Sequence, residues 1–311
     1  MRYVLLAFLL LAIGCQSVEP KPPTPNRPKP VAESLQGTPL YPLEEPEAVL
    51  QKKDSLLAIA FSNFQKDSTN LEAIIWYGRR LAYFYRYPEA IAVYTKGLQH
   101  HPEAPELYRH RGHRYLSTRR LDKAIQDFST AARLAANRPI EIEPDGIPNK
   151  LNQPLSTLQF NIWYHLGLAH YIKHDFEEAI DAYKVCMSYS TNPDLLCATT
   201  DWLYMAYRRL GKTAEAAALL AVIQPDLEII ENTSYFNRLL MYKGLKAPQE
   251  LLNLESTDED AKLDLVTQGY GVGNWHLYNG DTLQAQKVFG QVLATGYWPA
   301  FGYLAAEAEI R

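Results

Sequence analysis

The sequence predicts an all-α fold built from repeated helical hairpins, and three observations support it. A pattern of small and aromatic residues recurs along the chain with a period of 34 residues. An amphipathic helical segment precedes the first repeat, and a short, partly charged one follows the last. The chain has 311 residues, 47% of them hydrophobic and 21% charged, which is a composition that can build a sizeable core. The net charge of −4 gives no reason to expect a nucleic-acid partner.

The first fifteen residues, "MRYVLLAFLLLAIGC", have the layout of a secretory signal. A single positive residue, Arg2, is followed by an apolar run of 11 residues and then by small Gly14. The run is shorter than the ~20 residues that a helix needs to cross a bilayer. The segment Ala12–Cys15 resembles the lipobox of bacterial lipoproteins, although the usual leucine at its first position is Ala12 here.

This resemblance implies a signal peptide over residues 1–14 and lipidation of Cys15, with palmitate among its acyl chains, which would anchor the protein to a membrane. Residue 16 is Gln rather than the Asp that retains some lipoproteins in the inner membrane, so we expect the outer membrane, facing the periplasm. A plain secretory signal, or an uncleaved anchor with an incidental Cys15, is the alternative.

A proline-rich stretch follows the cysteine. Residues 20–46 hold 9 of the 20 prolines and few apolar side chains, a composition biased towards extended polyproline conformation. We therefore expect residues 15–45 to be a tether and residues 46–311 to form the folded domain.

The repeats begin at residue 71. "WYGRRLAYFYRYPEAIAVYTKGLQHHP" superimposes on "RHRGHRYLSTRRLDKAIQDFSTAARL" 34 residues later, which aligns Gly78 with Gly112 and Tyr94 with Phe128. The spacing recurs at Gly167 and Tyr183, and again further along at Ala216 with Leu220 and at Gly273 with Phe289.

This pattern resembles the tetratricopeptide repeat, which has two antiparallel helices per 34 residues. The resemblance implies a right-handed α–α superhelix in which small residues let the helices of a hairpin approach closely. Our frames are residues 71–104, 105–138, 160–193, 197–230, a degenerate unit at 231–265, and 266–299, followed by a closing helix at 300–311.

In the resembled family, fixed positions of each first helix line the concave surface. Carried over to this sequence, the groove-binding candidates are Arg79, Tyr83, Arg109, His113, Asn161, Tyr164, Tyr171, Asp201, Arg208, Tyr270, Asn274 and Tyr278. Tyrosines, arginines and amides suit a binding surface, although a concave wall facing solvent is polar in any case. The resemblance implies a protein or peptide partner and a scaffold role in the cell envelope, without catalysis, and a cell-wall polymer is another class of ligand. The residues that clamp chaperone C-termini are absent, since that position holds Ile75.

Residues 139–159 are an insertion between the second and third repeats. Because insertions emerge at one edge of such a superhelix, we expect this one at the mouth of the groove, with Glu141, Glu143 and Asp145 facing the arginines of the basic second repeat. Apolar anchors are expected to hold it, namely Ile140, Ile142, Ile147, Leu151, Leu155 and Leu158. The alternative function is a small-ligand binder or enzyme whose site is formed by the insertion with the second and third repeats.

No motif for a phosphate loop, a nucleophile elbow or a dinucleotide site is present, so we expect neither catalysis nor a cofactor. His170 and His174 are spaced for a metal, but one falls on a packing position and the other at a turn, so we expect none. Cys186 and Cys197 flank one turn, and both a disulfide and a pair of buried thiols are open.

Overall fold

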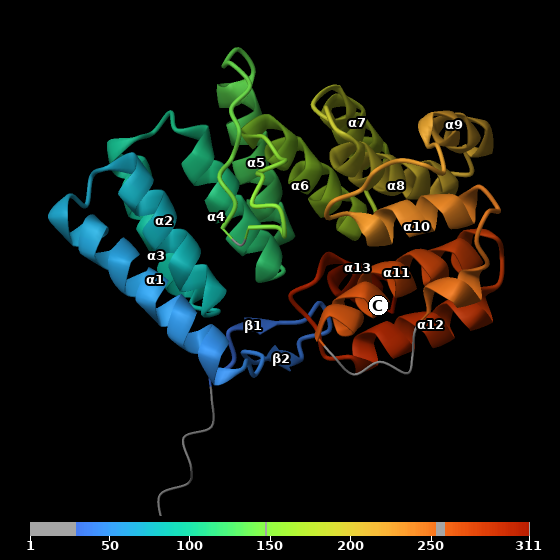
Figure 1. Ribbon diagram of the computed structural model, residues 1–311, viewed down its shortest axis with the longest axis horizontal. Coiled ribbons are helices and arrows are strands. Elements are labelled where there is room, and N and C mark those ends of the chain that lie inside the picture. Colours follow the sequence, from blue (N-terminus) through green and yellow to red (C-terminus); the bar gives the residue numbers. More distant parts are fainter. Residues whose placement is uncertain (1–28, 147, 253–258, 311) are drawn as a thin grey trace, which may run out of the picture.

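The computed structural model describes residues 29–146, 148–252 and 259–310, and this part of the chain is an all-α superhelix with one short β-hairpin (Figure 1). The predicted signal peptide and Cys15 lie outside the described residues. The α-helices are α1 (Glu47–Lys66), α2 (Leu71–Tyr83), α3 (Tyr87–His100), α4 (Pro105–Ser117), α5 (Leu121–Ala135), α6 (Leu158–Lys173), α7 (Phe176–Ser188), α8 (Pro193–Arg209), α9 (Thr213–Leu219), α10 (Thr233–Tyr242), α11 (Glu259–Tyr278), α12 (Thr282–Ala294) and α13 (Phe301–Glu309). Two 3₁₀ turns, η1 (Leu220–Val222) and η2 (Pro248–Leu251), follow α9 and α10.

The small and aromatic residues of the repeat pattern meet inside the hairpins. A Cβ atom added to Gly78 of α2 would lie 2.4 Å from the ring of Tyr94 in α3. The same addition to Gly167 of α6 would lie 2.8 Å from the ring of Tyr183 in α7. Only glycine allows this approach of helix to aromatic ring, which is the packing reason that the sequence pattern predicts.

The later units depart from the regular frame. Helix α8 begins at Pro193, four residues before its frame, because the side chain of Asn192 caps it by accepting from the backbone N–H of Leu195. Its partner α9 has 7 residues before the chain tightens into η1. In the degenerate unit α10 is the first helix, and η2 stands where a second helix would begin.

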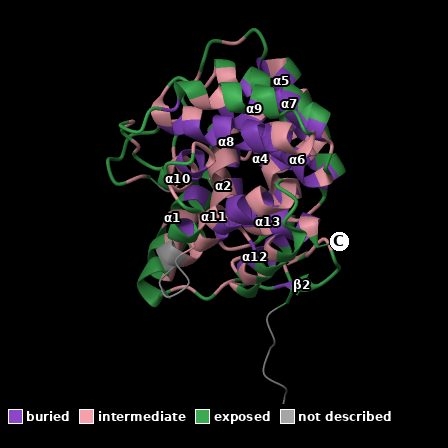
Figure 2. Ribbon diagram, turned by 90° about the vertical axis from the view of Figure 1, so that its right-hand side faces the viewer, coloured by how far each residue is buried: buried purple, intermediate pink, exposed green. Residues whose placement is uncertain are grey.

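The C-terminal helices fold back onto the concave side of the middle repeats. Helix α11 packs against α8, and α13 packs against α11, α12 and α6. Figure 2 shows buried residues gathered along α4, α6, α8, α11 and α13, with exposed residues on the outer helices. The main core therefore includes side chains from the second repeat to the closing helix.

The N-terminal hairpin joins the two ends of the superhelix. Strand β1 (Ala32–Glu33) pairs antiparallel with β2 (Pro39–Leu40), and both lie between the N-terminal and C-terminal helices (Figure 1). The side chain of Gln36 donates to the carbonyl oxygen of Glu307 over 2.6 Å. The expectation that the tether extends to residue 45 is therefore corrected: from about Val31 onward the chain is packed, because Leu40 supplies a buried apolar side chain to the core of the first repeat.

The segment before α13 completes this closure. Trp298 is buried against the rings of Tyr85 and Tyr87, and its indole N–H donates to the carbonyl oxygen of Tyr41 over 2.7 Å. Arg119, in the turn between α4 and α5, pairs with Glu307 of α13 at 2.8 Å, and both side chains are almost fully buried. Within the described ranges, no helix has both the length and the apolarity to cross a bilayer.

Candidate functional site: the concave surface

The predicted groove residues fall into two groups. Arg79, Tyr83, His113, Arg208 and Tyr278 are partly exposed. The others are buried: Arg109, Asn161, Tyr164, Tyr171, Asp201, Tyr270 and Asn274. The expectation that this second set lines an open groove is corrected, because the chain's own insertion and C-terminal helices cover it.

Tyrosine and amide side chains join α6 to α11 in the covered region. The hydroxyl of Tyr270 and the amide N–H of Asn274 both donate to the hydroxyl oxygen of Tyr171, at 2.9 and 3.1 Å. Arg209 donates to the amide oxygen of Asn274 over 3.2 Å and also pairs with Glu309 of α13. Burial raises the pKa of Glu309, but His174 and Arg209 outweigh it and hold that pKa below its ordinary value of 4.5. These side chains hold the protein closed and leave no room for a partner.

Asp201 of α8 is paired in the interior. Its carboxylate accepts from Arg238 of α10, and neither side chain is exposed. Arg238 also donates to the carbonyl oxygen of Thr267 over 2.8 Å and lies 4.9 Å from the centre of the Tyr235 ring. Burial raises the pKa of Asp201 to about 6, against the opposing effect of Arg238. Asp201 therefore holds α8 to α10 and is not available to a ligand.

Arg208 and Tyr278 lie at the rim of this covered region. The guanidinium of Arg208 sits 4.2 Å from the centre of the Tyr278 ring and donates to the side-chain oxygen of Asn279 over 2.7 Å. Tyr164, further inside, accepts from the indole N–H of Trp202 over 2.8 Å. These contacts again run from one part of the chain to another.

Histidines lie between the N-terminal repeats and this covered region. The rings of His113 in α4 and His165 in α6 lie 4.6 Å apart, and Phe301 of α13 packs against both. Burial, with Arg109 next in effect, lowers the pKa of His165 to about 3. Burial also lowers the pKa of His110 well below its ordinary value, so these rings are neutral at pH 7.

The insertion lies on the concave side, over the first three repeats. The carboxylate of Glu143 pairs with Arg109 at 3.0 Å and accepts from the side chain of Asn161 over 3.2 Å. The prediction that a carboxylate of the insertion faces an arginine of the second repeat is thereby confirmed. Arg79 and Arg80 of α2 donate to two carbonyl oxygens of the insertion, those of Pro144 at 2.8 Å and Gly146 at 3.1 Å.

The apolar anchors expected for the insertion are mostly turned outward. Ile140 is 57% exposed, Ile142 63% and Leu151 57%. Leu158 is buried as expected, and Ile147 lies outside the described residues. The expectation of apolar anchoring is therefore wrong for the three exposed residues, because the segment runs antiparallel to itself, with Ile142 paired to Thr157, and its polar atoms provide the contacts to the helices.

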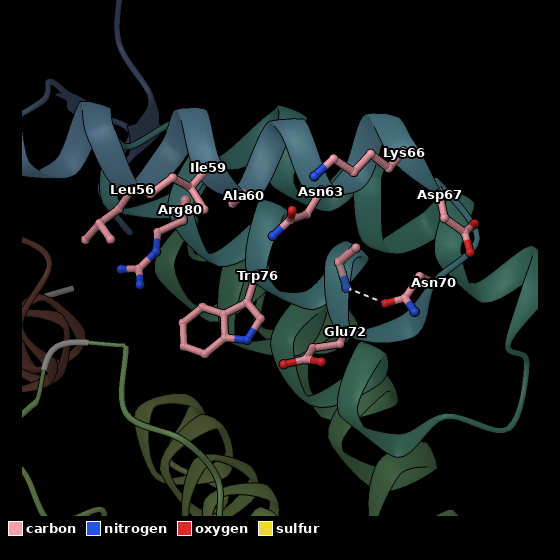
Figure 3. A pocket seen from close by; sticks show the side chains of 11 residues that line it. Leu56, Ile59, Ala60, Asn63, Lys66, Asp67, Asn70, Glu72, Trp76 and Arg80 are labelled. Atoms are coloured by element: carbon pink, nitrogen blue, oxygen red, sulfur yellow. Dashed lines mark hydrogen bonds between the residues drawn. The ribbon is translucent and has the colours of Figure 1, made fainter.

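Two cavities leave the N-terminal part of the concave surface open. The first, about 410 Å³, lies between α1 and α2, and Figure 3 shows side chains of these two helices on its opposite walls. The second, about 480 Å³, lies between α2, α4 and the insertion. Asn70, Glu72 and Trp76 line both cavities, which therefore adjoin, and we call the two together the N-terminal groove.

Trp76 is the central side chain of the N-terminal groove, and sequence reasoning missed it. The guanidinium groups of Arg79 and Arg80 lie 4.5 and 5.0 Å from the centre of its ring. Its repeat position is not among the concave positions carried over from the resemblance. The spacing of "WYGRR" is the signal that could have found it, since residues three and four apart share one face of a helix.

The two cysteines in the described part of the chain, Cys186 and Cys197, are free thiols in separate apolar clusters. Cys186 packs in the main core and lies 3.4 Å from the hydroxyl of Thr199, whereas Cys197 packs with Ile223 and Leu239. The disulfide is therefore corrected to a pair of buried thiols, which was the alternative. Burial raises the pKa of both thiols to about 12.

His170 and His174 bind carboxylates of the chain. His170 lies 3.7 Å from Asp175, and His174, in a left-handed conformation at the end of α6, lies 3.5 Å from Glu309. No cluster of three metal-binding side chains occurs in the part of the chain that the structure describes.

Comparison with known proteins identifies the repeats. Models of the tetratricopeptide repeat match residues 78–139 and residues 160–193, and the second match has the bounds of the third frame. No curated protein matches the sequence.

Solved structures with a similar fold include YrrB, described as a TPR protein with an unusual peptide-binding site. It has 13% identity and a TM-score of 0.43, and the match covers 81% of this chain and 98% of YrrB. A putative kinesin light chain of Podosopora anserina with TPR-like repeats has 15% identity and a TM-score of 0.36, with 78% of this chain and 94% of that one covered. The Naa15/Naa10 complex bound to HypK-THB has 15% identity and a TM-score of 0.37, with 76% and 33% covered.

Repeats of this kind typically serve as protein-interaction scaffolds. The matches fall on α2 to α7, the helices that carry the small and aromatic packing pattern. The chain thus contains tetratricopeptide repeats, at residues 78–139 and 160–193, within an all-α superhelical fold.

Proposed function

We propose that the protein is an exported, lipid-anchored scaffold of the bacterial cell envelope that binds a segment of a partner protein in the N-terminal groove and catalyses no reaction. The observation that carries this proposal is the pair of adjoining cavities that extend from α1 to the insertion and share Trp76 as a wall. The later concave surface is filled by the chain's own tyrosines, so the N-terminal groove is where a partner segment has room.

The lining of the groove suits a peptide. Trp76 offers a large apolar surface flanked by two cations, and buried aromatic side chains of this type often contribute most of the binding energy of an interface. Asn63 and Asn70 line the first cavity and can bond to the backbone of an extended peptide. The repeats provide the rigid frame that keeps the cost of binding low.

Lipidation of Cys15 would place this groove near a membrane, most naturally the outer membrane on its periplasmic side. Because the fold begins near residue 31, the tether is about 15 residues long and spans about 45 Å when extended. Labelling of the protein in cells with a palmitate analogue that carries an alkyne tests the anchor. The Cys15→Ser variant should lose the label and be released in soluble form, and a labelled Cys15→Ser variant would contradict lipidation at this residue.

Trp76→Ala tests the groove. If Trp76 anchors the partner, its loss should weaken binding by at least about 30-fold. The measurement is crosslinking in the native envelope followed by mass spectrometry, which identifies the partner, and then titration of the purified partner.

Leu283→Ala is the control, since Leu283 is 83% exposed on α12, away from the groove. Recovery of the same partners in the same amounts with Trp76→Ala would exclude the N-terminal groove as the binding site.

A small-ligand binder is the second candidate, and the 480 Å³ cavity under the insertion is the observation that favours it, because such a volume suits a small molecule. This function requires the insertion as a wall of the site. Deletion of residues 140–156 should then abolish ligand binding while the helical content is kept, whereas unchanged capture of a partner by the deletion variant would exclude it.

A further inference from the structure

The acidic part of the insertion is bound in the way a foreign peptide would be. Side chains from three successive repeats hold residues 143–146: Arg79 and Arg80 from the first, Arg109 from the second and Asn161 from the third. Their partners in the insertion are two backbone carbonyl oxygens and one carboxylate. Any extended peptide with one suitably placed acidic residue could provide the same three kinds of contact.

The hold on this segment is polar. Ile140 and Ile142 are mostly exposed, so the segment buries little apolar surface against the helices. The outer turn of the insertion is attached through the side chain of Asn149, which donates to Glu231 in the loop before α10. A polar attachment can be exchanged for equivalent polar contacts with another chain, because the lost and the gained hydrogen bonds are of the same kind.

The surface under the segment is cationic. Arg109 is 8% exposed, and Glu143 is the carboxylate that pairs with it among the described residues. Burial lowers the pKa of Arg109, and the nearby positive charges of Arg79 and Arg114 act in the same direction. A buried cation without a counterion is costly, so whatever replaces Glu143 must itself bring negative charge.

We propose that residues 140–146 are an intramolecular ligand of the concave surface, and that an extended acidic segment of the partner protein displaces them and binds to Arg79, Arg80 and Arg109. This inference rests on the proposed function and adds the chemistry of the partner and a means of control. The insertion competes with every partner, and only a segment that supplies both a carboxylate for Arg109 and free carbonyl groups can replace it.

Competition within one chain is strong. A short flexible connection presents its ligand at an effective concentration in the millimolar range. The measured affinity of a partner is reduced by the fraction of molecules whose site is open. Weakening the insertion should therefore tighten the binding of an external acidic peptide, which is the opposite of what a small-ligand site walled by the insertion requires.

The test uses the full chain in detergent and a fluorescent peptide with the sequence of residues 139–147, "PIEIEPDGI". Binding is followed by anisotropy. Glu143→Gln removes the charge that holds the insertion to Arg109, and it should bind the peptide at least about tenfold more tightly than the parent protein. Glu231→Ala loosens the insertion from outside the groove and should also bind the peptide more tightly. A peptide in which Gln and Asn replace the acidic residues is the matched control and should bind neither variant.

Equal peptide affinity of the parent and both variants would overturn the inference, as would equal binding of the uncharged peptide. Circular dichroism shows whether Glu143→Gln keeps its helices, and if it does not, Glu231→Ala decides alone. Displacement of the peptide by an anionic polysaccharide, with no acidic protein segment able to do so, would overturn the assignment of a peptide partner.

The two proposals can fail separately. A partner whose capture needs Trp76 but is equal for the parent, Glu143→Gln and Glu231→Ala would contradict the intramolecular ligand and leave the proposed function intact. Capture that is independent of Trp76 would contradict the proposed function.

Discussion

The concave surfaces of the N-terminal repeats and of the later repeats consist of the same repeat positions, but the first is partly exposed and the second is buried. Arg79 and Asn274 occupy the ninth position of their repeats. Arg79 is partly exposed and lines the N-terminal groove, whereas Asn274 is fully buried between Tyr171 and Arg209. The repeat therefore decides which side chains face inward, and what they meet there depends on which other part of the chain folds against them.

The largest expected difference concerns charged residues. Asp201→Asn leaves Arg238 as a buried cation without its counterion, and we expect it to lower the free energy of unfolding by about 3–5 kcal/mol. Urea denaturation at pH 7.5, above the raised pKa of Asp201, measures it.

Arg79→Ala is the counterpart in the N-terminal groove. Arg79 is partly exposed and bonds to a carbonyl oxygen rather than to a carboxylate, so its loss should change stability by no more than about 1 kcal/mol. Equal losses in the free energy of unfolding for Asp201→Asn and Arg79→Ala would remove the distinction between the N-terminal groove and the covered region.

Acid should destabilise the protein at the buried histidines of α4 and α6. The pKa values of His110 and His165 lie below that of an unfolded histidine, about 6.5, so below this pH the unfolded chain takes up protons that the native protein does not. The stability from keeping these rings neutral is complete above pH 6.5 and is lost as the pH falls towards the folded values. Between pH 7.5 and 5.5 the free energy of unfolding should fall by about 3 kcal/mol for the two residues.

Urea denaturation across this pH range gives the slope. Burial also lowers the pKa of His113 well below its ordinary value, so His165→Gln should reduce the histidine part of the slope by about a third. His100→Gln, a change at an exposed histidine, is the control and should follow the parent protein. A parent protein whose stability is level from pH 7.5 to 5.5 would show that these histidines are not held neutral.

The smallest expected difference concerns two tyrosines. Tyr171→Phe leaves the amide of Asn274 without this acceptor in the interior, whereas the hydroxyl of Tyr270 keeps Glu309 as an acceptor, and the change should cost about 1–3 kcal/mol. Tyr83→Phe, at the partly exposed end of α2, should stay within about 0.5 kcal/mol of the parent. Thermal and urea unfolding measure the loss in stability of both variants. A loss for Tyr83→Phe as large as that for Tyr171→Phe would show that the N-terminal groove is packed as tightly as the covered region.

The insertion shows how far sequence reasoning reached into the candidate site. The interrupted 34-residue period located it, and the acidic run opposite a basic repeat predicted the contact of Glu143 with Arg109. The prediction that its apolar residues pack inward was wrong, because the identity of a residue such as Ile142 does not show whether it faces the core or solvent. The backbone pairing of Ile142 with Thr157 leaves its side chain exposed. The groove itself depends on Trp76, a position that the resemblance does not mark.

By itself, the sequence determined the hairpins of this protein. Gly78 with Tyr94 and Gly167 with Tyr183 are local pairs, separated by 16 residues, and their sizes permit one packing. Only the tertiary structure decided that Trp298 and Leu40 join one apolar cluster, that Glu307 pairs with Arg119, and that the later concave surface is covered. The physical reason is that a contact between distant segments depends on the sum of every small rotation between successive repeats, and no single stretch of sequence specifies that sum.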